Sequence, residues 1–347
     1  MKRDIMLMSE DELKEYFESI GEKKFRGGQV HEWIHKKLAD DFSEMTNISG
    51  ALKDKLNEDF FIEHFTIEDR LISEIDGTEK YLFGLRDGNV IESVLMRYKH
   101  GNSVCISTQV GCRMGCRFCA STLDGLVRNL TVSEMLKEVY TIQRISGERV
   151  SNIVLMGSGE PMDNYENTVE FVKRISNENG LHISQRNITI STCGIVNKIK
   201  KLADEKLGIT LAISLHASDD ETRKELMPVA KSFTIKEILE ACDYYYKKTG
   251  RRISFEYSLV AGVNDNINEA KKLTGLIKGM NCHVNLIPVN PIKERSYKRS
   301  DRKSVEAFRD YLNNHGINAT VRRELGSDIN GACGQLRKSY TERKVES

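Results

Sequence analysis

The sequence lacks any uninterrupted apolar stretch that approaches the roughly 18 residues of a membrane-spanning helix. Its start, Met1-Lys2-Arg3-Asp4, turns acidic at Ser9-Glu10-Asp11-Glu12, and no apolar core of a signal peptide follows. Hydrophobic residues make up 39% and charged residues 30% of the 347 residues, a balance typical of soluble globular proteins. We therefore expect a cytoplasmic protein with no membrane partner.

The chain also lacks the cysteine density of a secreted disulfide scaffold and the strong positive charge of many nucleic-acid-binding proteins. Three of its 8 cysteines lie close together, which favours a reducing compartment and a local metal site. The net charge of +1 argues against RNA binding unless basic residues are segregated. Two groups offer such segregation, although each could simply be a solvated face: Lys23, Lys24, Arg26, His31, His35, Lys36 and Lys37, and Lys293, Arg295, Lys298, Arg299, Arg302 and Lys303.

The first 95 or so residues have a pattern of their own. Ser9 and Glu12 form a capping box before an amphipathic run over 13–20, and apolar residues recur at helical spacing over 25–38. A third helix is expected over 51–60, and strands are expected over 81–85 and 90–96. We predict a small N-terminal helical accessory domain over 1–95.

From Ser103 onward, strand patterns alternate with helical patterns. The predicted strands cover 104–108, 153–156, 188–191, 209–215, 253–259 and 284–288. Thr131 with Glu134 and Thr234 with Glu237 look like capping boxes at two helix starts, and a further helix is expected over 302–315. Six such units predict an α/β fold, an open partial (β/α)6 barrel over 96–347, with functional residues at the carboxyl ends of its strands.

Cys112, Cys116 and Cys119 form a C-x3-C-x2-C motif just after the first of these strands. Three thiolates on one short loop can ligate three irons of a [4Fe–4S] cluster and leave the fourth iron open. An open iron can chelate the amino and carboxylate groups of S-adenosylmethionine (SAM), and one electron can then release a 5′-deoxyadenosyl radical. The alternatives are a zinc site with Cys105 as a fourth ligand, an electron-transfer module, or three buried cysteines without a metal.

The motif and its surroundings resemble the RlmN family of dual-specificity RNA methyltransferases, within the radical SAM superfamily. The similar segments are Cys105-Ile-Ser-Thr-Gln-Val-Gly-Cys112, Gly157-Ser-Gly-Glu-Pro161, Ser214-Leu215-His216, Arg322-Arg323-Glu324-Leu325-Gly326-Ser327-Asp328-Ile329 and Ala332-Cys333-Gly334-Gln335-Leu336. The resemblance runs along nearly the whole chain. It implies methylation of adenine C2 in RNA, at adenine 2503 of 23S rRNA and in many members at adenine 37 of tRNA, with an electron donor such as flavodoxin or ferredoxin.

The expected SAM pocket begins with Gly159 and Glu160, because glycine lets the backbone approach a ligand and a carboxylate can pair with the SAM ammonium group. The resemblance adds further SAM contacts at strand ends: Ser191, Ser214, Leu215, His216 and Asn290. The chain departs from the family at Ser158, where methionine is usual, and at Cys193, where serine is usual. We assign Cys193 no role.

The resemblance also implies a covalent route with two SAM molecules per turnover. Cys333 takes a methyl group from the first, and the radical from the second converts it to an S-methylene radical that adds to adenine. Cys105 then attacks the Cys333 sulfur to form a transient disulfide, while Glu92 accepts the ring proton. Without the resemblance, Cys333 would be an ordinary loop thiol, Cys105 a strand core residue and Glu92 a surface carboxylate.

Two other radical SAM activities remain as alternatives. An antibiotic-resistance relative methylates adenine C8 with the same machinery, but it typically lacks the proline that this chain has at Pro161, and Arg322-Arg323-Glu324 also favours the C2 group. A radical SAM enzyme that acts on a small molecule or a protein would not need both Cys105 and Cys333.

Overall fold

A computed structural model describes residues 2–291 and 295–331 of the chain. The N-terminal part contains helices α1 (Glu10–Ser19), α2 (Phe25–His35) and α3 (Gly50–Asp59), with a short parallel pair, β1 (Arg3–Asp4) and β2 (Phe60–Phe61). The capping box predicted for α1 is present: Glu12 N donates to Ser9 Oγ at 3.2 Å, and Ser9 N donates to the Glu12 carboxylate at 2.7 Å. The three predicted N-terminal helices are thus confirmed.

The rest of the described chain is built on one ten-stranded sheet with the order β14-β13-β12-β11-β10-β9-β6-β5-β4-β3. Six parallel strands match the prediction: β6 (Gly101–Cys105), β9 (Val150–Leu155), β10 (Ile188–Thr192), β11 (Thr210–Ser214), β12 (Ile253–Leu259) and β13 (Cys282–Pro288). A seventh parallel strand, β14 (Ala319–Val321), was not predicted, because three residues are too few to show an alternating pattern.

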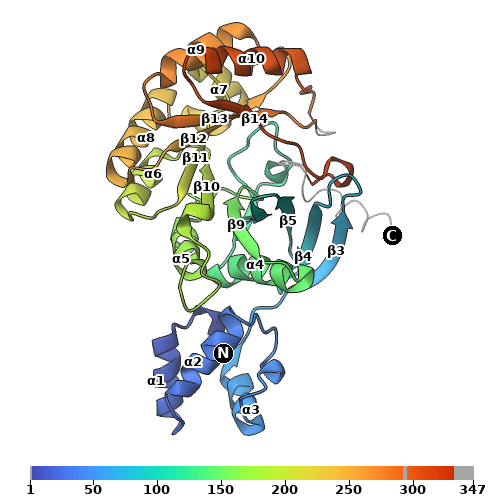
Figure 1. Ribbon diagram of the computed structural model, residues 1–347, viewed down its shortest axis with the longest axis vertical. Coiled ribbons are helices and arrows are strands. Elements are labelled where there is room, and N and C mark those ends of the chain that lie inside the picture. The colour runs from blue at the N-terminus through green and yellow to red at the C-terminus, as the bar shows by residue number, and fades with distance from the viewer. Residues whose placement is uncertain (1, 292–294, 332–347) are drawn as a thin grey trace.

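Helices follow the parallel strands and pack on one side of the curved sheet, as Figure 1 shows for α5, α6 and α8 to α10. They are α4 (Val132–Ser146), α5 (Tyr165–Ile175), α6 (Val196–Asp204), α7 (Asp220–Leu226), α8 (Ile235–Thr249), α9 (Ile267–Ile277) and α10 (Arg302–Asn314). The capping boxes predicted at Thr131 and Thr234 start α4 and α8. These right-handed crossovers leave the carboxyl ends of the strands facing one common space.

Three antiparallel strands extend the same sheet beyond β6: β3 (Thr66–Ile72), β4 (Glu79–Gly84) and β5 (Val90–Tyr98). The strands predicted over 81–85 and 90–96 are therefore present, and they are hydrogen-bonded into the barrel sheet. The division of the chain at residue 95 stays a prediction. Successive β5 residues face opposite sides of the sheet. Ser93 faces α4, where it donates to the buried Glu138 carboxylate, so Glu92 faces the other side.

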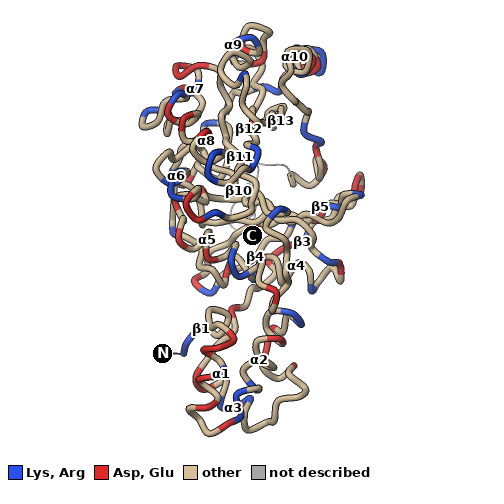
Figure 2. Tube along the Cα trace, turned by 60° about the vertical axis from the view of Figure 1, so that its left-hand side comes forward, with Lys and Arg blue, Asp and Glu red and all other residues tan. Residues whose placement is uncertain are grey.

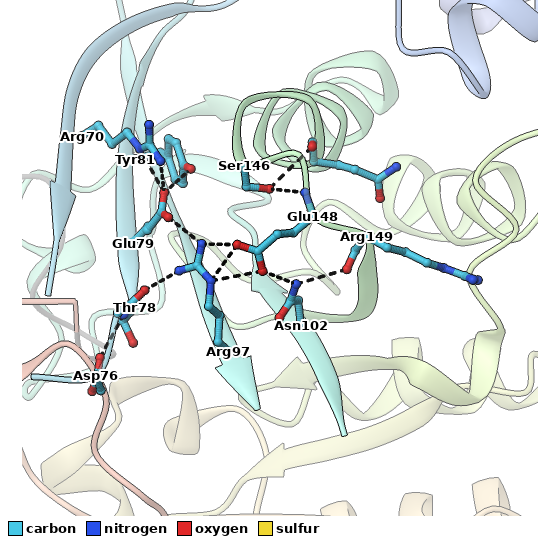
Figure 3. Close-up of polar contacts among 12 residues, drawn as sticks. Arg70, Asp76, Thr78, Glu79, Tyr81, Arg97, Asn102, Ser146, Glu148 and Arg149 are labelled. Atoms are coloured by element: carbon cyan, nitrogen blue, oxygen red, sulfur yellow. Dashed lines mark hydrogen bonds and ion pairs between the residues drawn. The ribbon is translucent and has the colours of Figure 1, made fainter. Parts of the chain in front are cut away.

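An ion-pair network anchors these strands to the barrel (Figure 3). The Arg97 guanidinium of β5 lies 2.6 Å from Glu79 Oε1 of β4 and 2.6 Å from Glu148 Oε1, which follows α4. Arg70 of β3 pairs with the same Glu79 at 2.7 Å, and Asn102 of β6 donates to Glu148 at 2.8 Å. The buried Glu79 carboxylate and two arginines, Arg70 and Arg97, thus tie β3, β4 and β5 to the connection between α4 and β9.

The N-terminal helices pack on α4 and α5 (Figure 1). His35 Nδ1 lies 2.9 Å from the Tyr140 hydroxyl of α4, and Lys137 of α4 pairs with Asp40. His31 and His35 are buried here, and both line a cavity between the N-terminal helices and α5, so they do not belong to an exposed basic surface. Within residues 2–291 and 295–331, no helix has the length and apolar character needed to cross a bilayer.

Candidate active site

The C-x3-C-x2-C loop is held by a small hairpin inside the barrel. Strands β7 (Gln109–Gly111) and β8 (Leu126–Asn129) pair on either side of the loop, and Cys112 N donates to Gly125 O at 2.9 Å. A 3-10 turn, η3 (Ala120–Thr122), follows Cys119, and the Thr122 hydroxyl donates to Cys119 O at 2.9 Å. Local hydrogen bonds therefore position the three cysteines before any metal is added.

The three cysteines open into a cavity at the carboxyl ends of the parallel strands, with about 1070 Å³ of space between its walls and mouth. A cavity at the carboxyl ends of parallel strands, with polar groups among apolar walls, is a usual place for a small-molecule site. Of the predicted site residues, nine line it: Cys112, Cys116, Cys119, Gly159, Glu160, Ser191, Ser214, His216 and Asn290. The structure thus brings the predicted cluster ligands and most of the predicted SAM contacts together in one place.

The electrostatics of the thiols show how close they lie to one another. Burial raises the pKa of the Cys112 thiol to about 12, and the negative charges of Glu160 and Cys119 act in the same direction. Burial also raises the pKa of Cys116 well above its usual value, with contributions from Cys119 and Cys112. Such thiols stay protonated unless a cation binds, and a metal centre deprotonates the thiols that ligate it. Three mutually close thiols on the cavity wall, with Cys112 buried and Cys116 and Cys119 half-buried, therefore fit an iron–sulfur cluster.

The zinc alternative finds less support. A zinc ion needs its ligands to converge on one point, whereas the cysteines of a cubane cluster each bind a separate iron. In the part of the chain that the structure describes, no three His, Cys, Asp or Glu side chains could share one metal ion. Cys105, the proposed fourth zinc ligand, is not among the residues that line the cavity.

Glu160 is held as a preorganised carboxylate in the cavity wall. Cys193 N donates to its Oε2 at 2.8 Å and Met162 N donates to its Oε1 at 3.0 Å. Burial raises the pKa of Glu160, while these backbone hydrogen bonds oppose that rise. The carboxylate can pair with an ammonium group of a ligand. The backbone of Cys193, a residue to which we had assigned no role, therefore helps to hold Glu160.

Gly159 meets a strict steric requirement beside Glu160. Its φ of +107° is rarely adopted by residues with a side chain, and a Cβ at this position would lie 2.6 Å from Gln109 Cβ. Gln109 cannot easily withdraw, because its Oε1 accepts from Glu160 N at 2.9 Å and its Nε2 donates to Asp163 at 2.9 Å. Glycine here lets the loop after β9 lie directly on β7.

His216 presents a neutral imidazole to the cavity. Ser258 N donates to its Nδ1 at 2.9 Å, which places the ring proton on Nε2. Burial lowers the pKa of His216 to about 3, and the Arg223 charge acts in the same direction. At the ends of neighbouring strands, Ser191 Oγ and Ser214 Oγ lie 3.4 Å apart. These groups are hydrogen-bonding partners suited to the polar parts of a nucleoside.

Leu215 and Arg223 differ from the sequence-based expectation. The Leu215 side chain is fully buried in the hydrophobic core and is not among the residues that line the cavity. Its carbonyl accepts from Arg223 Nε at 3.1 Å, and Arg223 Nη2 donates to Cys193 O at 2.6 Å. Arg223 is completely buried and fastens the ends of β10 and β11. Sequence reasoning missed it, because an arginine on a short helix usually faces solvent.

Glu92 and Cys105 lie on one face of the sheet, next to the cavity. Val94 pairs with Cys105 across β5 and β6, and Glu92 is two residues from Val94, so all three side chains share a face. Glu92 is only 3% exposed, so the reading of it as a surface carboxylate is wrong. Cys105 packs in a small buried cluster with Val94, Met96 and Leu325. Lys80 of β4 pairs with Glu92 at 3.3 Å and was not predicted.

Cys333 lies outside the described residues, but the segment before it, residues 326–331, is docked on the turn between β3 and β4. Ser73 Oγ donates to Asp328 Oδ1 at 2.7 Å, and Glu74 N donates to Asp328 Oδ2 at 2.9 Å. Gly326 N donates to Asp76 at 2.9 Å. The N-terminal strands therefore position the start of the predicted catalytic-cysteine segment.

A second, smaller cavity of about 500 Å³ adjoins the first and shares Asn290 and Arg322 with it. Tyr98, Arg299 and Arg323 also line it. Arg299 belongs to the second predicted basic group, of which Lys293 lies outside the described residues. Elsewhere, basic and acidic positions are interspersed over the N-terminal part and the barrel (Figure 2), so positive charge is segregated only locally.

Two family models match the chain. One describes the N-terminal domain of ribosomal RNA large subunit methyltransferases and matches residues 3–62. The other describes the radical SAM superfamily and matches residues 106–274. The two matches correspond to the N-terminal helices and to most of the parallel barrel.

Relatives match over almost the whole length. The chain is 62% identical over 344 residues to a probable dual-specificity RNA methyltransferase RlmN of Lachnoclostridium phytofermentans, covering 99% of this chain and 97% of the relative. It is 58% identical over 342 residues to a protein of the same description from Clostridium perfringens, covering 99% of each. The crystal structure of a radical SAM methyltransferase from Sphaerobacter thermophilus superposes with a TM-score of 0.93 at 40% identity, covering 96% of this chain and 99% of that chain. The predicted fold class is thereby confirmed.

Proposed function

The chain belongs to the RlmN family of dual-specificity RNA methyltransferases, which are radical SAM enzymes, and we propose that it methylates the C2 carbon of adenine in RNA. The proposed targets are adenine 2503 of 23S rRNA and adenine 37 of tRNA. The observation that carries the proposal is the cavity that gathers Cys112, Cys116 and Cys119 with Glu160 and its neighbours, next to a sheet face that bears Glu92 and Cys105.

Cys112, Cys116 and Cys119 would hold a [4Fe–4S] cluster, and Glu160 would pair with the SAM ammonium group. When bound, the cluster and SAM supply a 5′-deoxyadenosyl radical that can remove a hydrogen atom from a methyl group. Ser191, Ser214 and Asn290, with the Nε2 proton of His216, offer hydrogen bonds that orient the nucleoside part of SAM. Their place in the cavity wall supports these roles. Leu215 would contribute only through its backbone.

The covalent chemistry would belong to Cys333, Cys105 and Glu92. The Cys333 thiolate would attack the methyl group of a first SAM and release S-adenosylhomocysteine. The radical from a second SAM would remove one hydrogen atom from that S-methyl group, and the methylene radical left on Cys333 would bond to adenine C2. The adduct would then pass one electron to the oxidised cluster, and Glu92 would take the C2 proton. Cys105 thiolate attacks the Cys333 sulfur, which breaks the S–CH2 bond and forms a disulfide. The released carbon gains a proton and becomes the methyl group.

The RNA would lie over the cavity mouth and the N-terminal helices. Arg299 and Arg323 line the adjoining cavity; Arg299 pairs there with Glu324 at 2.7 Å, so Arg323 is the better candidate to neutralise a phosphate. On α2, the exposed Phe25 ring lies 5.0 Å from the Arg26 guanidinium, and the Trp33 ring lies 4.2 Å from Lys37 Nζ. An exposed aromatic ring with an adjacent cation, as at Phe25, suits the stacking of an unpaired base, whereas Trp33 is half-buried and offers only part of its ring. An external one-electron donor such as flavodoxin or ferredoxin would complete the system.

Mass spectrometry of adenosines from rRNA and tRNA tests this function. Anaerobically reconstituted enzyme is incubated with a reductant, methyl-labelled SAM and unmodified 23S rRNA or tRNA, and 2-methyladenosine and 8-methyladenosine are measured. Label in 2-methyladenosine from both RNAs is the expected result. Label in 8-methyladenosine would instead assign the chain to the C8 activity, and the absence of label from both would refute the proposal.

A further inference from the structure

Lys80 is a buried lysine with two partners that matter for the proposed chemistry. Its side chain is 5% exposed, which is rare for lysine, because a buried ammonium group is stable only when it is paired with acceptors or negative charges. Its Nζ lies 3.3 Å from Glu92 Oε1 and donates to the Asn330 carbonyl at 3.4 Å. One ammonium group thus contacts the proposed proton acceptor and the segment that leads to Cys333.

The sheet register explains why this lysine points toward the site. On β4 and β5, Lys80 pairs with Val94 and Leu82 pairs with Glu92, so Lys80 is the diagonal neighbour of Glu92 on the same face. The neighbouring Glu79 faces the opposite side, where Arg70 and Arg97 neutralise it. The Arg97 network in Figure 3 therefore lies on one face of β4, and Lys80 lies on the opposite face, beside Glu92.

The other charged groups around Glu92 have separate partners among the described residues. Glu138 of α4 lies on the opposite face of β5, bonded to Ser93 and to Ser107 N. On the segment that covers Glu92, Glu324 pairs with Arg299 at 2.7 Å and Asp328 is held by Ser73. Cys105 of β6 shares the face with Glu92 as a buried thiol.

We propose that Lys80 is a positioning residue for the methyl transfer, one that keeps Glu92 ionised and holds the start of the Cys333 segment beside it. The proposal rests on the function proposed above. A buried carboxyl group without a cation takes up a proton, and a protonated Glu92 cannot accept the proton of adenine C2. Lys80 counters that tendency with a charge, and its bond to Asn330 O places the same charge beside the residues that precede Cys333 in the chain.

The role predicts a defect late in the reaction. Lys80 and Glu92 are not among the residues that line the cavity with the three cysteines and the proposed SAM contacts, so SAM cleavage and the bond to adenine should form normally without Lys80. Removal of the C2 proton should slow, because Glu92 has then lost the cation 3.3 Å from its carboxylate, and a buried carboxyl group that loses such a cation binds a proton more readily. The enzyme should stop with RNA attached through Cys333, and raising the pH should release it, because hydroxide restores the carboxylate.

The test uses full-length reconstituted enzyme and three variants, Lys80→Met, Lys80→Gln and Lys80→Arg. Glutamine retains a donor for Asn330 O without the charge, and arginine retains the charge. At each pH between about 6 and 9, 5′-deoxyadenosine, RNA-linked protein and 2-methyladenosine are measured. Lys80→Met and Lys80→Gln should cleave SAM within about twofold of wild type. Near pH 7, both variants should form about tenfold less 2-methyladenosine than wild type and should accumulate RNA-linked protein. The acid limb of their pH–rate profiles should lie about one pH unit higher. Lys80→Arg should restore the profile.

Two control variants distinguish a positioning role of Lys80 from a role in folding alone. Lys137→Met removes another buried lysine, 2% exposed and paired with Asp40, that is remote from the site; it should weaken folding without changing the pH profile or trapping RNA. Glu92→Gln should trap RNA at every pH. Wild-type product and pH profile in both neutral Lys80 variants, or loss of SAM cleavage in parallel with loss of product, would overturn the inference. Normal turnover by Glu92→Gln would instead refute the proposed base.

Discussion

Replacing Gly159 by alanine should weaken SAM binding by an amount that its surroundings allow to be estimated. Gly159 has φ +107°, and an alanine Cβ would meet Gln109 Cβ at 2.6 Å and Gln109 N at 2.8 Å. The backbone conformation alone costs a residue with a side chain about 1–3 kcal/mol. The contact with Gln109 N cannot be relieved by rotating a side chain, so the loop after β9 has to shift.

That shift has a second cost. Gln109 Oε1 accepts from Glu160 N at 2.9 Å, and moving the loop would break this bond, which contributes about 0.5–1.5 kcal/mol. The total is about 2–4 kcal/mol. If the loop moves while the fold is retained, Glu160 leaves its place, and the loss appears as a rise in the dissociation constant of SAM of about 30-fold or more.

The assay compares Gly159→Ala with Gly250→Ala. Gly250 ends α8 with φ +67°, and a Cβ there would meet no atom within 4 Å, so alanine should cost only about 1 kcal/mol and leave SAM binding intact. SAM affinity is measured by anaerobic equilibrium dialysis of the reconstituted enzymes, and stability by urea unfolding. A Gly159→Ala enzyme that equals Gly250→Ala in both measurements would show that the steric reasoning is wrong.

Three further predictions follow from the same geometry. Cys116→Ala should abolish 5′-deoxyadenosine formation in an assay with SAM and dithionite, and a variant that still forms it would refute the cluster assignment. Cys105→Ala should accumulate RNA joined to Cys333, visible as a slowly migrating band on denaturing gels; absence of that band during turnover would count against its resolving role. Burial lowers the pKa of His35 to about 3, so the folded protein keeps this histidine neutral while the unfolded chain protonates it below about pH 6.5. The stability it contributes is present at pH 7 and is lost as the pH falls, so wild type should lose about 2 kcal/mol more than His35→Gln between pH 7 and pH 5 in urea titrations. Equal losses would contradict the burial.

Local patterns were sufficient to predict much of the fold. The capping boxes at Ser9, Thr131 and Thr234 all start helices, and six strand patterns became parallel strands. Pairing between distant segments could not be predicted in this way. Strand β3 was not predicted, and the pattern that predicted β4 and β5 did not show that β6 of the barrel pairs with β5 in the same sheet. Hydrophobic alternation identifies a strand without identifying its neighbour.

The same distinction applies to the site. The cysteine motif and the glycine-rich loop are local, and the structure places both on one cavity. Lys80 and Arg223 carry no such signal, because a single basic residue in a strand or on a short helix is usually solvated. Their importance comes from partners far away in the chain: Asn330 for Lys80, and Cys193 and Leu215 for Arg223. Leu215 shows the converse, a residue inside a recognisable motif whose side chain belongs to the core.

The tight connection between β4 and β5, closed where Leu85 N donates to Asn89 O at 2.8 Å, has a consequence for how the chain can vary. Adding or deleting one residue there would slide β5 by one position and exchange its two surfaces. Glu92 would then turn away from the face that it shares with Cys105 and into the space beside Glu138, where two carboxyl groups would be buried together, and Ser93 would take its place. The length of this connection should therefore tolerate change as poorly as the reacting side chains themselves.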